Sequence, residues 1–222
     1  MTPTPERTGI EVILAARDER LAGAWERACG DMGCVRIHRG SILDVACDAL
    51  VSPANSYGFM DGGLDALYSD RFGWDVETRL RRLILDRHGG ELLVGTAEIV
   101  ETGNIAHPFL IAAPTMRVPM VLHTPTVNPF LATRAVLRLA RHGVFPPGSA
   151  LAGEPVRQAV RSIAFPGMGT GVGRVPPAIC ARQMRAALDE FLLDLFREPA
   201  DWAEASERHQ LLYTDRPTRL QY

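Results

Sequence analysis

Short apolar runs alternate with amphipathic segments along most of the chain. Short apolar runs bounded by turn residues predict buried strands, and apolar positions spaced three and four apart predict helices. The predicted strands are 10–15, 35–38, 47–52, 95–101, 109–113 and 163–165. The predicted helices are 18–28, 62–72, 75–87, 129–141 and 176–196. This alternation predicts an α/β layered fold around a largely parallel, buried sheet.

Individual side chains support two of these helix predictions. Asp18 stands where it can cap the first helix by accepting hydrogen bonds from free backbone N–H groups. In the helix 75–87, Leu80, Leu83 and Ile84 fall on one face, which we expect to be buried. We expect a single domain over 1–222, with a core at about 10–197 and a polar appendage at about 198–222 that packs on its surface.

Charge and composition narrow the possible partners. The net charge of -2 does not favour an electrostatic hold on nucleic acid, although a local basic groove stays open. All basic residues other than histidine are arginine, which excludes any lysine nucleophile or Schiff base. No apolar run approaches membrane-spanning length and no secretion signal is visible, so we expect a cytoplasmic protein without a membrane partner.

The four cysteines do not form a recognisable framework. Cys29, Cys34, Cys47 and Cys180 form no CxxC pair, and the sequence has no cluster of histidines at ligand spacing. We expect free thiols in a reducing compartment, and neither a zinc site nor any other metal site.

The stretch 163–177, IAFPGMGTGVGRVPP, places four glycines between a strand and a helix. Backbone N–H groups at such a junction lack partners, and glycine lets a phosphate approach the main chain closely. A tight turn that serves only helix packing is the alternative. The stretch 48–68 has the same order of strand, polar turn and glycine-led helix, so two such turns can converge at one sheet edge and suit a diphosphate.

Five blocks together resemble the macrodomain family. They are RGSI at 39–42, DALVSPAN at 48–55, GGLDAL at 62–67, GTAEIVETGN at 95–104 and IAFPGMGTGVG at 163–173. The resemblance implies a three-layer α/β/α sandwich with a mixed, largely parallel central sheet of about six strands. It also implies binding of ADP-ribose and, in some members, its hydrolysis from modified proteins or nucleic acids.

The resemblance assigns roles to residues of the first turn. Asn55 stands at the family asparagine that contacts the distal ribose, and Gly62 and Gly63 match the first phosphate loop. Asp65 matches the aspartate that MacroD-type hydrolases use near the scissile bond. Because the helix dipole favours an ionised carboxylate in the first turn of a helix, Asp65 need not have the raised pKa of a strong base.

Two further blocks depart from the family pattern. Ser41 replaces the aspartate that grips adenine, beside Ile42, so adenine recognition is expected to be weaker or differently built. Gly169, Thr170, Gly171, Val172 and Gly173 match the second phosphate loop. The last of these stands where the family often has an aromatic residue, and Phe59 or Tyr57 is a candidate replacement for that wall.

The family histidine has no counterpart on the predicted strand. The stretch 121–129, VLHTPTVNP, is similar to the family sequence around it, but 109–115 follows the preceding strand directly. We therefore place Ala112 at the family histidine and His123 in an extra stretch near the pocket mouth.

The resulting hypothesis is a MacroD-like ADP-ribosyl hydrolase that removes mono-ADP-ribose from acidic side chains of modified proteins. Asn55 and Asp65 are its predicted catalytic residues; it needs no cofactor, and we expect a monomer in a bacterial cytoplasm. A non-catalytic reader of ADP-ribose, a hydrolase acting on modified nucleic acid and a module that has lost its pocket are the alternatives. The lysine-dependent branch of the family is excluded by the absence of lysine.

Overall fold

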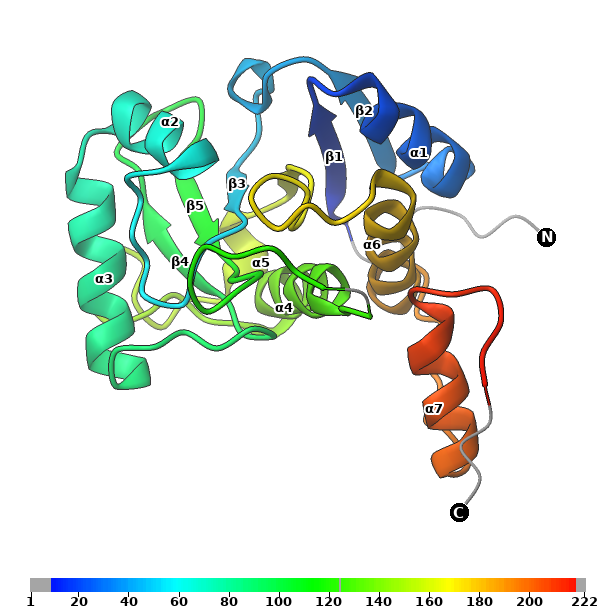
Figure 1. Cartoon of the computed structure of the whole chain (residues 1–222). Helices are drawn as coiled ribbons and strands as arrows, with labels where there is room; N and C mark the ends of the chain where they lie inside the picture. Colours follow the sequence, from blue (N-terminus) through cyan, green and yellow to red (C-terminus); the bar gives the residue numbers. More distant parts are fainter. Residues whose placement is uncertain (1–8, 124, 219–222) are drawn as a thin grey trace.

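The computed structural model describes residues 9–123 and 125–218, and the ends of the predicted domain and appendage lie outside the described residues. Its strands are β1 (Glu11–Ala16), β2 (Val35–Arg39), β3 (Ala49–Ser52), β4 (Glu98–Glu101), β5 (Phe109–Ala112) and β6 (Ser162–Phe165). They form one sheet of 6 strands in the order β2-β1-β6-β3-β5-β4 (Figure 1). Four neighbouring pairs are parallel, and only β4 and β5 pair antiparallel within the described chain. The predicted mixed, largely parallel sheet is confirmed.

Helices cover both faces of this sheet. They are α1 (Glu19–Cys29), α2 (Gly63–Phe72), α3 (Asp75–His88), α4 (Asn128–His142), α5 (Val156–Ala159), α6 (Pro177–Leu192) and α7 (Trp202–Leu211), with a 3₁₀ turn η1 at Ile42–Asp44. One hydrophobic cluster joins α1, α4 and α6 to the sheet through residues such as Val12 and Leu14. The other joins α2 and α3 to it through Ile13. Successive residues of β1 therefore face opposite layers, as a strand buried on both sides requires.

The local signals in the sequence explain where the helices begin and what they bury. The Asp18 carboxylate accepts a hydrogen bond from the N–H of Arg20 at 2.9 Å and caps α1 as predicted. Leu80, Leu83 and Ile84 of α3 are buried, which confirms the inward face of that helix.

The end of the chain differs from the prediction in two ways. Helix α6 ends at Leu192 instead of continuing to 196, and Leu195 and Phe196 beyond it are exposed. The appendage was expected to pack on the domain surface. Instead it forms α7, which buries none of its residues and projects beyond α6 (Figure 1). The ion pair between Arg182 and Asp215, at 2.7 Å, ties it to α6.

The cysteines are free thiols; Cys29, Cys47 and Cys180 are buried and Cys34 is half-buried. Across the described ranges, no helix has the length and apolar character needed to cross a membrane.

Candidate functional site

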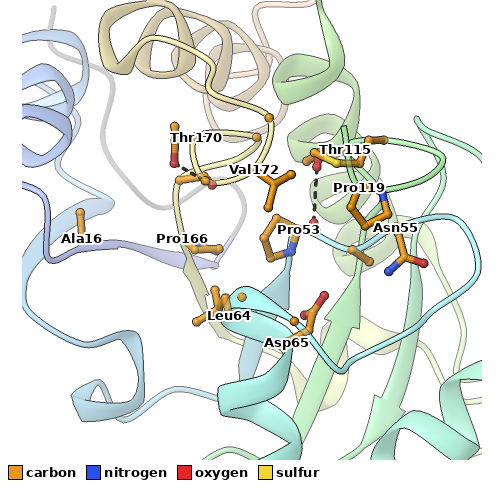
Figure 2. A pocket seen from close by; sticks show the side chains of 18 of the residues that line it. Ala16, Pro53, Asn55, Leu64, Asp65, Thr115, Pro119, Pro166, Thr170 and Val172 are labelled. Atoms are coloured by element: carbon orange, nitrogen blue, oxygen red, sulfur yellow. Dashed lines mark hydrogen bonds between the residues drawn. The ribbon is translucent and has the colours of Figure 1, made fainter. Parts of the chain in front are cut away.

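A pocket of about 410 Å³ lies at the carboxyl ends of the central strands. Its lining includes Ala16 at the end of β1, Pro53 after β3 and Pro166 after β6. Open α/β sheets bind ligands at this edge, because the loops that leave neighbouring parallel strands converge there. Figure 2 shows Leu64 and Asp65 on one side of Pro53, and Thr170 and Val172 on the other.

The first glycine loop, residues 61–65, leads into α2 and lines the pocket. The backbone N–H groups from Asp61 to Asp65 donate no hydrogen bond to any part of the chain that the structure describes. Gly62 occupies the N-cap and supplies no side chain that could cap these donors. The free N–H groups and the positive end of the helix dipole together make this loop attractive to an anion.

The second glycine loop, residues 167–173, faces the first across the pocket. The N–H groups from Thr170 to Gly173 also donate to no described residue. Gly169 has a φ of 72°, and a Cβ on Gly173 would lie 2.5 Å from the carbonyl oxygen of Gly169. The loop therefore needs glycine at both positions to keep its shape.

The donors of this second loop do not come from a helix start, contrary to the sequence-based expectation. Helix α6 begins only at Pro177, with Pro176 as its N-cap. Proline has no N–H group, so the start of α6 offers fewer donors than an ordinary helix. The loop's own backbone supplies them instead.

Asp65 lies in the first turn of α2, lines the pocket and is 8% exposed. Its Oδ1 accepts a hydrogen bond of 2.6 Å from the Ser52 hydroxyl at the end of β3. Burial raises the pKa of the Asp65 carboxyl to about 7, against the lowering effect of the Ser52 hydrogen bond. The sequence did not require a raised pKa at this position; in the structure the pKa is raised, because burial disfavours the charged carboxylate.

Asn55 lines the pocket, but its carboxamide is engaged by its own loop. Its Oδ1 accepts hydrogen bonds from the N–H groups of Tyr57 and Phe59, at 3.1 and 3.3 Å, and its Nδ2 donates to the Phe59 carbonyl at 2.8 Å. One N–H of the carboxamide is left for a ligand. Phe59 lines the pocket, whereas the Tyr57 hydroxyl lies outside the lining and donates to Glu91 at 3.0 Å.

A segment over 116–122, here called the capping segment, closes one side of the pocket. Met116 and Pro119 contribute to the lining. The N–H of Leu122 donates to the carbonyl of Gly173 at 2.9 Å, and the Leu122 side chain would meet any Cβ placed on Gly173. The capping segment thus occupies space beside the position where the family often carries an aromatic ring.

Three predicted positions lie outside the described lining. Ser41 caps η1 by accepting a hydrogen bond from the N–H of Leu43 at 3.3 Å, and Ile42 is buried in the core. Their part in adenine recognition stays a prediction. His123 is exposed and follows the capping segment directly, and Thr124 of the same stretch lies outside the described residues.

Sequence reasoning missed several residues of the pocket. Arg17 and Leu21 reach it from the end of β1 and the start of α1, and Ser52 supports Asp65. Within the described lining, Arg17 is the one cationic side chain, beside Asp18, Asp61 and Asp65. The position of Arg17 two residues after the predicted strand 10–15 was the available signal. No cluster of three or more metal-ligating side chains occurs in residues 9–123 and 125–218.

Comparisons with known proteins agree with this architecture. The macro domain family matches residues 51–184. A protein of Aquifex aeolicus is 31% identical over 157 residues, which are 71% of this chain and 82% of that relative.

Two solved structures share the fold. The macrodomain of Mycobacterium tuberculosis DarG superposes with a TM-score of 0.53 and 18% identity over 68% of this chain and 87% of that one. A point mutant of the Oceanobacillus iheyensis macrodomain with ADPR gives a TM-score of 0.54 and 21% identity over 69% of this chain and 75% of that one. The family match covers more than half of the chain, including both glycine loops and strands β4, β5 and β6, so the chain belongs to the macro domain family.

Proposed function

We propose that the pocket binds ADP-ribose, with the diphosphate held between the two glycine loops. The observation that carries this proposal is the pair of facing backbone segments whose N–H groups, from Asp61 to Asp65 and from Thr170 to Gly173, have no partner in the described chain. Such donors stabilise an anion without having to reorganise. The structure of the Oceanobacillus iheyensis macrodomain mutant with ADPR supports the choice of ligand.

We further propose that the protein hydrolyses mono-ADP-ribose from acidic side chains of modified proteins. In this reaction a water oxygen bonds to the anomeric carbon of the distal ribose, and the bond from that carbon to the acyl oxygen breaks. The modified side chain leaves as a carboxylate. The proton lost by the water passes to the Asp65 carboxylate and then to solvent.

The environment of Asp65 suits this role. A general base works best when its pKa lies near the working pH, and burial brings the pKa of Asp65 to about 7. The helix start beside it holds the diphosphate, so the distal ribose can be positioned near the carboxylate. Asn55 is proposed to orient the ribose through its remaining N–H.

The decisive experiment measures release of labelled ADP-ribose from a protein modified on glutamate and aspartate. The native protein is compared with Asp65→Asn and with Asp70→Asn, a control on the exposed side of α2. We expect release by the native protein and the control, and a loss of about 100-fold or more in Asp65→Asn. Release by Asp65→Asn at the native rate would overturn the proposed role of Asp65.

One observation favours a reader of ADP-ribose as the second candidate. The Asn55 carboxamide forms three hydrogen bonds with its own loop, which limits its contact with a ribose. Titration calorimetry with ADP-ribose separates the cases. The reader is favoured if the protein binds ADP-ribose but releases it neither from a modified protein nor from a modified nucleic-acid end. Absence of binding at millimolar ligand would contradict both functions.

A further inference from the structure

The buried contact between Ser52 and Asp65 is built from two elements that meet at the sheet edge. Ser52 ends β3, where its carbonyl accepts a hydrogen bond from the N–H of Ala113 at 3.0 Å and its side chain is fully buried. Its hydroxyl donates to Asp65 Oδ1 at 2.6 Å, the short distance typical of a hydrogen bond to a carboxylate. This is the only side-chain hydrogen bond of Asp65 to any described residue.

The other carboxylate oxygen is available to the pocket. Asp65 Oδ2 has no hydrogen-bond partner among residues 9–123 and 125–218, and it is not among the fully buried polar atoms that lack one. Because the residue lines the pocket, this oxygen can reach a bound water or a ribose hydroxyl. One oxygen is therefore fixed by the sheet while the other is presented to the ligand.

We propose that Ser52 is a positioning residue for Asp65. The Ser52 hydroxyl fixes the Asp65 carboxyl group in the pocket and favours its ionised form. The catalytic consequence of this proposal rests on the proposed hydrolysis. The hydrogen bond between Ser52 and Asp65 does not depend on it. A serine hydroxyl that donates to a carboxylate stabilises the charged state, which a base must reach before it can accept a proton.

Among the groups around Asp65, Ser52 makes the contact that opposes the effect of burial on the pKa of Asp65. Glu77 of α3 acts in the same direction as burial and raises the pKa of Asp65. Tyr68 on α2 is buried and donates its hydroxyl to the Val51 carbonyl at 3.0 Å. The other groups are Cys47, which acts electrostatically on Tyr68, and Arg17, Asp18 and Asp61 in the pocket lining. Loss of the Ser52 hydroxyl would therefore leave a carboxyl group that ionises less readily at neutral pH.

Three variants distinguish the positioning role of Ser52 from the effect of removing any buried hydroxyl. Ser52→Ala removes the hydrogen bond and Ser52→Thr keeps a hydroxyl at the same position. Ser69→Ala is the matched control, because Ser69, on α2, is also a buried serine, and its hydroxyl donates to the Met60 carbonyl at 3.0 Å instead of to Asp65.

The first measurement is a carbon-13 NMR titration of the Asp65 carboxyl in the ligand-free protein, with Asp65→Asn to assign the signal. We expect Ser52→Ala to raise the midpoint by about one pH unit, and Ser52→Thr and Ser69→Ala to leave it near the native value. An unchanged midpoint in Ser52→Ala, or an equal shift in Ser69→Ala, would overturn the proposal.

The second measurement is the pH profile of ADP-ribose release. In Ser52→Ala we expect the acidic limb to move to higher pH by the same interval, with kcat lowered more than KM. A shifted midpoint with an unchanged pH profile would overturn the catalytic part of the proposal. If the native protein releases nothing, the proposed hydrolysis fails, and the NMR midpoint alone decides whether Ser52 controls Asp65.

Discussion

Arg117 and Glu91 form a bidentate ion pair beside the pocket. The Nη2 of Arg117 lies 2.6 Å from Glu91 Oε1, and its Nε lies 2.9 Å from Glu91 Oε2. The Tyr57 hydroxyl donates to the same carboxylate, and the Arg117 carbonyl accepts a hydrogen bond from the N–H of Ser56 at 3.1 Å. These contacts connect the capping segment with the Asn55 loop, so they hold two walls of the pocket together.

Breaking this pair is expected to weaken ligand binding more than it weakens the fold. In Arg117→Ala, we expect the dissociation constant for ADP-ribose to rise several-fold, because the capping segment loses its fixed position. The Arg117 side chain is exposed and that of Glu91 is half-buried, and an ion pair so close to solvent stabilises the fold little, so the melting temperature should change little. Calorimetry and thermal unfolding measure the two effects, with Arg138→Ala on the exposed face of α4 as control. An equal loss of affinity in both variants would contradict this prediction.

The Arg117 guanidinium and the Tyr57 hydroxyl lower the pKa of Glu91 to about 2, below its ordinary value of 4.5. The pair's contribution is therefore present above the ordinary value and is lost as pH falls through about 2. We expect the effect of Arg117→Ala on affinity to be constant between pH 6 and 9, measured by calorimetry at fixed salt. A decline of that effect across this range would show that another group controls the contact.

Stability should depend on pH through Asp65. Its pKa is about 7 in the folded protein against an ordinary value of 3.8, so the native state retains a proton that the unfolded chain releases. The stability gained from that proton is complete below the ordinary value and is lost as pH rises through about 7.

Asp65→Asn removes the cost of ionising a buried carboxyl. We expect it to raise the free energy of unfolding by on the order of 4 kcal/mol at pH 8 relative to its effect at pH 4. Urea unfolding at the two pH values measures this difference, and Asp70→Asn serves as the exposed control. A pH-independent effect of Asp65→Asn would contradict the raised pKa.

The glycines of the second loop should respond differently to an added methyl group. At Gly173 a Cβ would lie 2.5 Å from the Gly169 carbonyl oxygen, whereas at Gly171 it would meet nothing within 4 Å. We expect Gly173→Ala to lower the free energy of unfolding by about 1–3 kcal/mol and Gly171→Ala to change it by less than about 0.5 kcal/mol. Urea unfolding measures both, and equal destabilisation would show that the loop relaxes around residue 173.

The buried thiols should resist modification in the folded protein. Burial raises the pKa of Cys29, Cys47 and Cys180 to about 12 in each case, while Cys34 is half-buried. Because the thiolate is the reactive species, we expect Cys34 to react first with a thiol reagent at pH 8 and the others only in denaturant. Mass spectrometry of the labelled peptides identifies them, and rapid native labelling of Cys180 would contradict the fold around α6.

The C-terminal helix should be dispensable for the pocket. Helix α7 buries none of its residues, and the sheet and both glycine loops lie elsewhere in the chain. We expect a chain ending at Glu198 to keep its ADP-ribose affinity within about twofold, with a small change in melting temperature. A loss of binding in this truncated chain would assign α7 a role in the site.

Much of the fold could be predicted because its signals are local. The apolar run of β1, the Asp18 cap and the inward face of α3 each follow from a few neighbouring residues. The stop of α6 at Leu192 could not be read in this way, because the residues that follow are apolar enough to extend the helical pattern. The exposure of α7 depends likewise on which surfaces the rest of the chain leaves unfilled.

The sequence by itself determined the α/β alternation, the two glycine-bearing turns and the positions of Asn55 and Asp65, because backbone freedom and periodicity are properties of short segments. Only the tertiary structure decided which groups meet in the pocket. The contact of Ser52 with Asp65 joins the end of a strand to the helix that follows it, and the entry of Arg17 and the closure by the capping segment join residues far apart in the chain. The pKa of Asp65 follows from the same cause, since desolvation depends on everything packed around the carboxyl group.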